Sequence, residues 1–167
     1  MGKLKRIFSV AMIGLCASAC FAKQICFQVV QHDETAEEVT EESLIVEDEI
    51  LTSFFESGYI VTNANAAVSK SDSQDGNLYR EGIREAFNGY SDYFIQINLF
   101  YSRTEDTTTK NADLQKVKFT IANANTGTTI ADKSFENIKA SQKKDDLKKI
   151  SLNLVTEINK ALKTNKA

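Results

Sequence analysis

The stretch DYFIQINLFY, residues 92–101, places the strictest limit on how this chain can fold. Its run of aromatic and β-branched side chains favours a strand over a helix. Ile95, Ile97 and Leu99 share one face, whereas two amides share the other face with two phenylalanines. Because apolar side chains occur on both faces, this segment predicts a central strand with helices on one side and less complete cover on the other.

Two more strands are expected directly after it, beyond a polar connection at residues 102–115. Residues 116–121 alternate between polar and apolar side chains, which is typical of a strand with one buried face. A short link rich in asparagine and glycine, residues 123–127, then leads into an apolar run at 128–135. Two such runs joined by this kind of link predict a hairpin.

Three segments carry apolar residues at helical spacing, and two short apolar runs predict further strands. Thr40 precedes the first helix as a cap and Gly58 follows it; Gly89 ends the second, and Ser141 caps the third. The helical stripes are Val46, Ile50 and Phe54; Tyr79, Ile83 and Phe87; and Leu147, Ile150, Leu154, Ile158 and Leu162. The further strands are expected at 24–31 and 59–62, and residues 63–77 are expected to form a polar loop.

The order of these segments is therefore β-α-β-α-β-β-β-α. It predicts an α+β fold with a mixed sheet of about five strands, the last three antiparallel, and with the helices packed on one face. Residues 23–167 are enough for a single domain with its own core.

Residues 1–22 are typical of a secretory signal. Lys3, Lys5 and Arg6 precede an apolar run at 7–15, which is shorter than the roughly 20 residues that a spanning helix needs. Two cleavage positions fit this segment. One lies after Ala22.

The other cleavage position lies before Cys20. Residues 17–20, ASAC, resemble the lipobox of bacterial lipoproteins, which implies a diacylglycerol on the Cys20 thiol. Ala17 departs from that pattern, where leucine or a β-branched residue is usual. With either cut the protein is expected to be exported, to the periplasm or to the outer membrane, and a lipid on Cys20 is its expected contact with a membrane.

The net charge and the cysteine content limit the partners and the thiol chemistry that the mature chain is expected to have. Of the 20 basic and 23 acidic residues, three basic ones lie in the signal, so the mature chain carries about −6 and nucleic acid is not an expected partner. Cys26 lies between Ile25 and Phe27 and is expected to be a buried, unreactive thiol.

The residues needed for catalysis or for a metal are scarce. His32 is the one histidine, and its polar surroundings predict an exposed side chain rather than a catalytic base. One histidine and so few cysteines do not make a zinc site. The spacing of Asp72 and Asp75 does not reproduce a calcium loop, and the nine carboxylates of residues 33–49 are expected to form a solvated face. We therefore expect no catalytic residue, no metal, no cofactor and no enzyme activity.

Two surfaces are candidates for binding a partner. Residues 139–166 carry eight lysines against three acids, so the last helix either pairs weakly with the acidic first helix or faces an anionic partner. On or beside the central strand, most of the aromatic rings are expected to pack in the core, and rings that are incompletely covered are expected to leave an apolar groove for a partner segment. The candidate residues are Lys143, Lys144 and Lys148 on the helix and Phe94, Phe100 and Tyr101 on the strand.

Three short motifs resemble those of a group of bacterial envelope domains. They are residues 57–61 (SGYIV), 89–94 (GYSDYF) and 125–127 (NTG), the last at the start of a strand. The group comprises the amino-terminal domain of TolB, the curli-secretion protein CsgG and the outer-membrane lipoproteins that activate penicillin-binding proteins. The resemblance implies the fold and the envelope location. The first strand of the group commonly ends in a motif with a proline, which this chain lacks because it has no proline. The chain also has no long amphipathic hairpin, so a pore like that of CsgG is not expected.

The expected function is a non-catalytic module that binds an envelope protein or another envelope component, free in the periplasm or tethered through Cys20. The alternative is a periplasmic carrier of a small apolar ligand or lipid, held between the helices and the sheet. The sequence indicates neither the partner's identity nor the oligomeric state.

Overall fold

The computed structural model describes residues 22–102, 113–140 and 144–164. Its sheet has six strands: β1 (Gln24–His32), β2 (Ile60–Asn63), β3 (Ala67–Val68), β4 (Tyr93–Ser102), β5 (Asp113–Asn123) and β6 (Thr129–Ala140). Three helices accompany it: α2 (Glu41–Glu56), α3 (Asp72–Asn88) and α4 (Lys144–Thr164). The α+β class predicted from the sequence is confirmed.

The sheet is mixed, as expected. Its strand order is β2-β1-β4-β5-β6, and the two-residue strand β3 also pairs with β1. β1 runs parallel to β2, β3 and β4, whereas β4, β5 and β6 form an antiparallel meander. The central position of the strand at residues 92–101 is thus confirmed, since β4 lies between β1 and β5.

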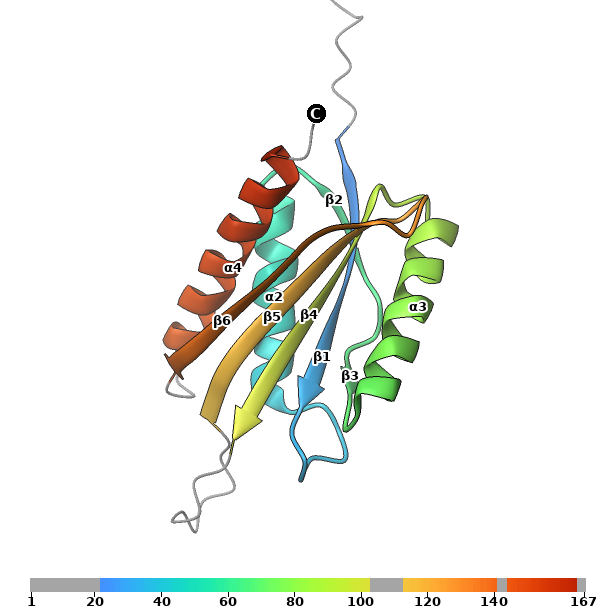
Figure 1. The fold of residues 1–167 in the computed structure, drawn as a ribbon. Coiled ribbons are helices and arrows are strands. Elements are labelled where there is room, and N and C mark those ends of the chain that lie inside the picture. The colour runs from blue at the N-terminus through green and yellow to red at the C-terminus, as the bar shows by residue number, and fades with distance from the viewer. Residues whose placement is uncertain (1–21, 103–112, 141–143, 165–167) are drawn as a thin grey trace, which may run out of the picture.

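The larger core lies between the sheet and the pair α2 and α4, which lie side by side behind it in Figure 1. Ile95, Ile97 and Leu99 of β4 point into this core and are fully buried. At about 25 cal/mol for each Å² of apolar surface removed from water, such side chains dominate the stability of the fold.

The third helix differs from the expectation, because α3 covers the opposite face of the sheet. There it closes a second, smaller core that contains Cys26, Ala86 and Phe94, with Tyr79 and Ile83 packed against it. The physical reason is that β1 and β4 carry apolar side chains on both faces, so each face near them needs a cover. The far half of that face, over β5 and β6, carries mainly polar side chains.

The chain fits tightly where α3 crosses β4. A Cβ atom placed on Gly82 would lie 2.1 Å from Cζ of Phe94, whose ring is fully buried. Only a glycine leaves the room that this ring occupies, so the helix and the strand can approach closely.

The boundaries of α2 and α3 follow their capping residues with two differences, and Ser141, the expected cap of the last helix, lies outside the described residues. α3 begins at Asp72, inside the segment expected to be a loop, because Ser71 accepts a hydrogen bond from the backbone N–H of Gln74 at 3.3 Å and two acids occupy the first turn. Thr40 precedes α2 as expected, but its hydroxyl makes no cap bond. Its backbone N–H donates instead to Oε1 of Gln31 at 2.8 Å.

The end of α3 has an unusual backbone. Gly58, after α2, has the expected positive φ of 85°, but Gly89, after α3, has a φ of −83°. The positive value falls on the next residue, Tyr90, at 59°, and that side chain is 90% exposed. A side chain in this region crowds its own backbone, which costs roughly 1–2 kcal/mol in a residue other than glycine.

We therefore expect the Tyr90→Gly variant to be more stable than the parent protein by about 1 kcal/mol in the free energy of unfolding, measured by urea denaturation. The exposed ring contributes little packing, so its loss does not offset the relief of strain. Tyr90→Ala is the matched control: it removes the ring but keeps a Cβ at positive φ, and its stability should change by less than about 0.5 kcal/mol. Equal stabilisation by both variants would contradict the backbone strain inferred at Tyr90.

Candidate binding groove

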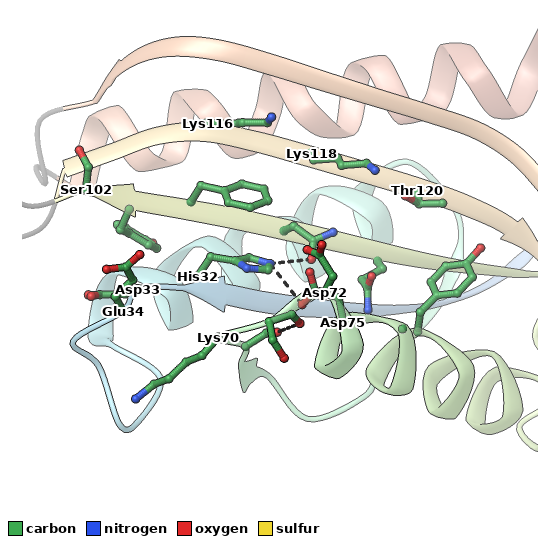
Figure 2. A pocket seen from close by; sticks show the side chains of 18 of the residues that line it. His32, Asp33, Glu34, Lys70, Asp72, Asp75, Ser102, Lys116, Lys118 and Thr120 are labelled. Atoms are coloured by element: carbon green, nitrogen blue, oxygen red, sulfur yellow. Dashed lines mark hydrogen bonds and ion pairs between the residues drawn. The ribbon is translucent and has the colours of Figure 1, made fainter.

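A groove opens on the α3 face of the sheet, where the helix leaves β4 and β5 uncovered. It encloses about 950 Å³. Figure 2 shows one wall formed by Lys116, Lys118 and Thr120 of β5, and His32 and Asp75 facing it from β1 and α3. The loop that carries Lys70 and the ends of β1 and β4 complete the lining.

The groove's position follows from strand alternation. Gln96, Asn98 and Phe100 occupy successive places on the α3 face of β4, and β5 places Lys116 and Lys118 beside the last two in register. Since side chains alternate between faces, the residues between them face the larger core. An antiparallel sheet with one solvated face is expected to carry polar side chains there.

His32 lies at the centre of a polar cluster. Its Nε2 atom lies 3.1 Å from Oδ1 of Asn98 and 3.7 Å from Oδ1 of Asp75. Its ring stacks on Phe100 with the centroids 4.2 Å apart. The expectation of an exposed histidine is wrong, because the side chain is only 15% exposed. Stacking and the bond to Asn98 hold the imidazole in place.

Several polar atoms around the groove lack a hydrogen-bond partner within the described part of the chain. They include Nε2 of Gln96, the hydroxyl of Tyr79 and Oδ1 of Asp75, each with almost no exposed surface. In folded proteins, most buried polar side-chain atoms have at least one partner. These three atoms therefore mark the part of the groove that is prepared for hydrogen bonding.

The lysines of the β5 wall already have counter-charges. Nζ of Lys116 lies 3.3 Å from Glu136, and Nζ of Lys118 lies 3.0 Å from Asp132, both on β6. The Lys116 ammonium also lies 5.4 Å from the centroid of the Phe100 ring. These pairs balance the positive charge of this wall before any ligand arrives.

The predicted aromatic residues have different surroundings. Phe94 is fully buried beneath α3, in contact with the core rather than with solvent. Phe100 and Tyr101 both line the groove, but the Tyr101 hydroxyl lies 2.9 Å from Oγ of Ser43, on the α2 side. Of the three, Phe100 lies where a bound molecule would meet it, and a role in binding stays a prediction.

Two of the three predicted lysines lie on the other face of the sheet. Lys144 is exposed at the start of α4, and Nζ of Lys148 lies 3.3 Å from Oε2 of Glu49 on α2. This ion pair supports the interpretation that α2 and α4 lie side by side with weakly attracting charges. Lys143 and Cys20 lie outside the described residues.

Cys26 is confirmed as a buried free thiol with 3% exposure. Burial raises the pKa of its thiol, although the Thr62 hydroxyl opposes that effect. A protonated, covered thiol reacts slowly. Within the described residues there is no group of three or more potential metal ligands, and none of the helices described is long and apolar enough to span a bilayer.

Tyr101 gives the fold a testable pH dependence. Burial raises the pKa of Tyr101 to about 12, against a smaller opposing effect of the Ser43 hydrogen bond. The ordinary tyrosine pKa is about 10, so between pH 10 and 12 the unfolded chain loses this proton while the folded chain keeps it. Stability is therefore complete below pH 10 and falls as the pH rises to 12.

We expect the free energy of unfolding to fall by about 2 kcal/mol across this window, measured by urea denaturation at several pH values. Burial also raises the pKa of Tyr59, which adds a smaller fall of the same sign. In the Tyr101→Phe variant only that smaller fall should persist. An unchanged pH dependence in Tyr101→Phe would show that another group is responsible.

An apolar cavity beneath α4 is small. It encloses about 250 Å³ between β5, β6 and α4, and its lining includes Val117, Phe135 and Ile150. Ligand pockets usually measure about 300–1,000 Å³. The polar groove falls within that range and the apolar cavity falls below it.

Comparisons with known proteins give a family and several matches in fold. A family model described as "Uncharacterised protein" matches residues 24–163. No curated protein matches the sequence. Among solved structures, TolB from Acinetobacter baumannii matches 84% of this chain and 28% of its own length, at 14% identity and a TM-score of 0.49.

Two other matches span most of both chains. The PelC dodecamer from Paraburkholderia phytofirmans matches 84% of this chain and 88% of its own, at 12% identity and a TM-score of 0.48. A lipoprotein from Neisseria meningitidis matches 83% of this chain and 99% of its own, at 11% identity and a TM-score of 0.41.

Proposed function

The chain belongs to the family described as "Uncharacterised protein", and we propose that it is a non-catalytic module that binds a component of the bacterial cell envelope. The binding site in this proposal is the groove between α3 and the uncovered half of the sheet. The observation that carries it is a set of polar atoms, on Gln96, Tyr79 and Asp75, that have no hydrogen-bond partner in the described ranges and line a groove large enough for a ligand.

The polar chemistry of the groove favours this function over a carrier of apolar ligands. A carrier needs an apolar cavity that removes most of its ligand from water. The apolar cavity beneath α4 encloses only about 250 Å³, whereas the groove of about 950 Å³ is bordered by amides, carboxylates and lysines. Lipid or another apolar molecule retained through native purification would support the carrier instead.

The environment of His32 favours binding over catalysis. Among the described residues, its Nε2 atom faces the amide of Asn98 and the carboxylate of Asp75. Nucleophilic catalysis needs the histidine beside a hydroxyl or thiol that it can activate. The observed cluster instead holds the imidazole as a fixed part of the groove wall.

The envelope location in this proposal comes from the sequence of residues 1–22, which are typical of a secretory signal. A lipid on Cys20 would place the module at the outer membrane, and cleavage after Ala22 would leave it free in the periplasm. The intact mass of the mature chain from its native host distinguishes these outcomes, because the two chains differ in both residues and lipid.

Photo-crosslinking in intact cells tests the groove as the binding site. The full-length chain would carry p-benzoylphenylalanine in place of Lys118, on the groove wall, or in place of Lys144, exposed on the opposite face. We expect a discrete adduct from position 118 and only background from position 144. An adduct from position 144 alone would contradict the groove and indicate that the lysine-rich helix is the binding surface.

A further inference from the structure

We propose that the groove binds a short cationic peptide, with an ammonium group of the peptide beside Asp75 and a peptide carbonyl beside Gln96. This inference rests on the proposed function, because it names the chemical class of the groove's ligand. It is carried by three polar atoms that have no hydrogen-bond partner among the described residues, and by the distribution of charge across the two walls.

Gln96 supplies the first requirement. The residue is 4% exposed, lines the groove and has no hydrogen-bond partner for its Nε2 atom among the described residues. An amide N–H group donates and does not accept, so the atom that completes this site is an acceptor. The carbonyl oxygen of a peptide group is such an acceptor.

Asp75 supplies the second requirement. Its side chain is 29% exposed, and its Oδ1 atom has no hydrogen-bond partner among the described residues, only a long ion pair with Nε2 of His32 at 3.7 Å. That nitrogen lies closer to Asn98, at 3.1 Å, so it does not satisfy the carboxylate oxygen. An ionised carboxylate oxygen only accepts, and an ammonium group donates in three directions.

The charge on each wall orients the ligand. Asp72 and Asp75 lie together in the first turn of α3, on one wall. On the other wall, Lys116 and Lys118 already pair with Glu136 and Asp132. The α3 wall therefore attracts a cation, whereas an anion would have to displace existing pairs to reach the lysines.

The hydroxyl group of Tyr79 is consistent with a peptide ligand. The OH group of Tyr79 lines the groove and has no hydrogen-bond partner in the described ranges. A phenol both donates and accepts, so it can pair with either the N–H or the C=O group of a peptide unit. The groove of about 950 Å³ has room for several residues of extended chain.

Calorimetric titration with tri-lysine amide tests the proposal. We expect binding by the parent protein, a loss of at least tenfold in affinity in the Asp75→Asn variant, and a similar loss when all the amines of the peptide are acetylated. Asp48→Asn is the matched control, since it removes the same charge from the exposed side of α2 and should leave the affinity within twofold. No binding of tri-lysine amide, or equal binding of its acetylated form, would overturn the proposal.

A second titration, with an anionic peptide, tests whether the groove prefers the opposite charge. Tri-glutamate should bind at least tenfold more weakly than tri-lysine amide, because the lysines of the groove are paired. Tighter binding of tri-glutamate would overturn the cationic class. Adducts from position 118 in cells without binding of tri-lysine amide would retain the proposed function and reject only this ligand class.

The Gln96→Leu variant gives a readout that a purely structural residue would not give. Leucine removes a buried N–H group that lacks a hydrogen-bond partner among the described residues, so the unliganded variant should unfold a few degrees higher than the parent protein. The same variant should lose at least fivefold in affinity for tri-lysine amide. A lower unfolding temperature would indicate that Gln96 supports the fold, and an unchanged affinity would remove it from the site.

Discussion

Replacing Phe54 with alanine should lower the free energy of unfolding by about 4 kcal/mol, the largest effect that we expect from a single substitution. Phe54 lies on α2 and is fully buried in the larger core. Its ring centroid lies 6.1 Å from that of Phe27 and 6.0 Å from that of Tyr59. Alanine removes these contacts and leaves a cavity that surrounding side chains fill only in part.

The neighbouring residue provides the control. Phe55 follows Phe54 on the same helix but is 73% exposed, so Phe55→Ala should change stability by less than about 0.5 kcal/mol. Urea denaturation followed by circular dichroism measures both variants under the same conditions. Similar losses in the two variants would show that the helix is rotated relative to the orientation described above.

The Gly82→Ala variant should lose about 3 kcal/mol of unfolding free energy, even though alanine is the better helix former. The added Cβ atom would meet the Phe94 ring at 2.1 Å, and that ring is fully enclosed in the smaller core. Relief requires α3 to move away from β4 or the ring to leave its place, and both disturb packing on this face.

Gly76→Ala, in the same helix, separates steric conflict from helix propensity. Nothing lies within 4 Å of a Cβ atom at position 76, so this variant should gain up to about 1 kcal/mol. Opposite signs for the two variants would confirm the close approach of α3 to β4. A gain in stability from both variants would contradict it.

The sequence predicts most of the elements because each one is defined by local periodicity. The meander β4-β5-β6 and the helices α2 and α4 follow from alternation and from stripes at helical spacing. Their ends are less well predicted: β5 begins at Asp113, earlier than the expected residue 116. Hydrogen-bonded pairing with β4 and β6 extends β5 beyond the residues whose alternating sequence pattern predicts a strand.

The face covered by α3 could not be read from periodicity. A helical stripe shows that one side of a helix is buried, but not which side of a sheet buries it. The one local signal is the small size of Gly82 and Ala86, which suits a helix that lies close to bulky side chains. Recognising it requires the contact with Phe94, which is a long-range feature.

The sequence predicts an apolar groove beside the aromatic residues of the central strand, whereas the groove found there is bordered mainly by polar side chains, with Phe100 among its lining residues. The sequence does not predict the polar residues that line the groove. His32, Asp75 and Asn98 meet through the parallel pairing of β1 with β4 and the start of α3. Residue types alone do not show that three separated segments converge. The polar sequence around His32 therefore predicts an exposed side chain.

The direction of β1 determines how far the groove lies from the point where the chain enters the domain. Figure 1 shows β1, which starts at Gln24 and ends at His32. The groove borders this last residue. The eight steps between the two residues, at about 3.3 Å each, separate them by about 26 Å. If Cys20 carries a lipid, the groove therefore lies at the end of β1 that is farther from the lipid along the chain.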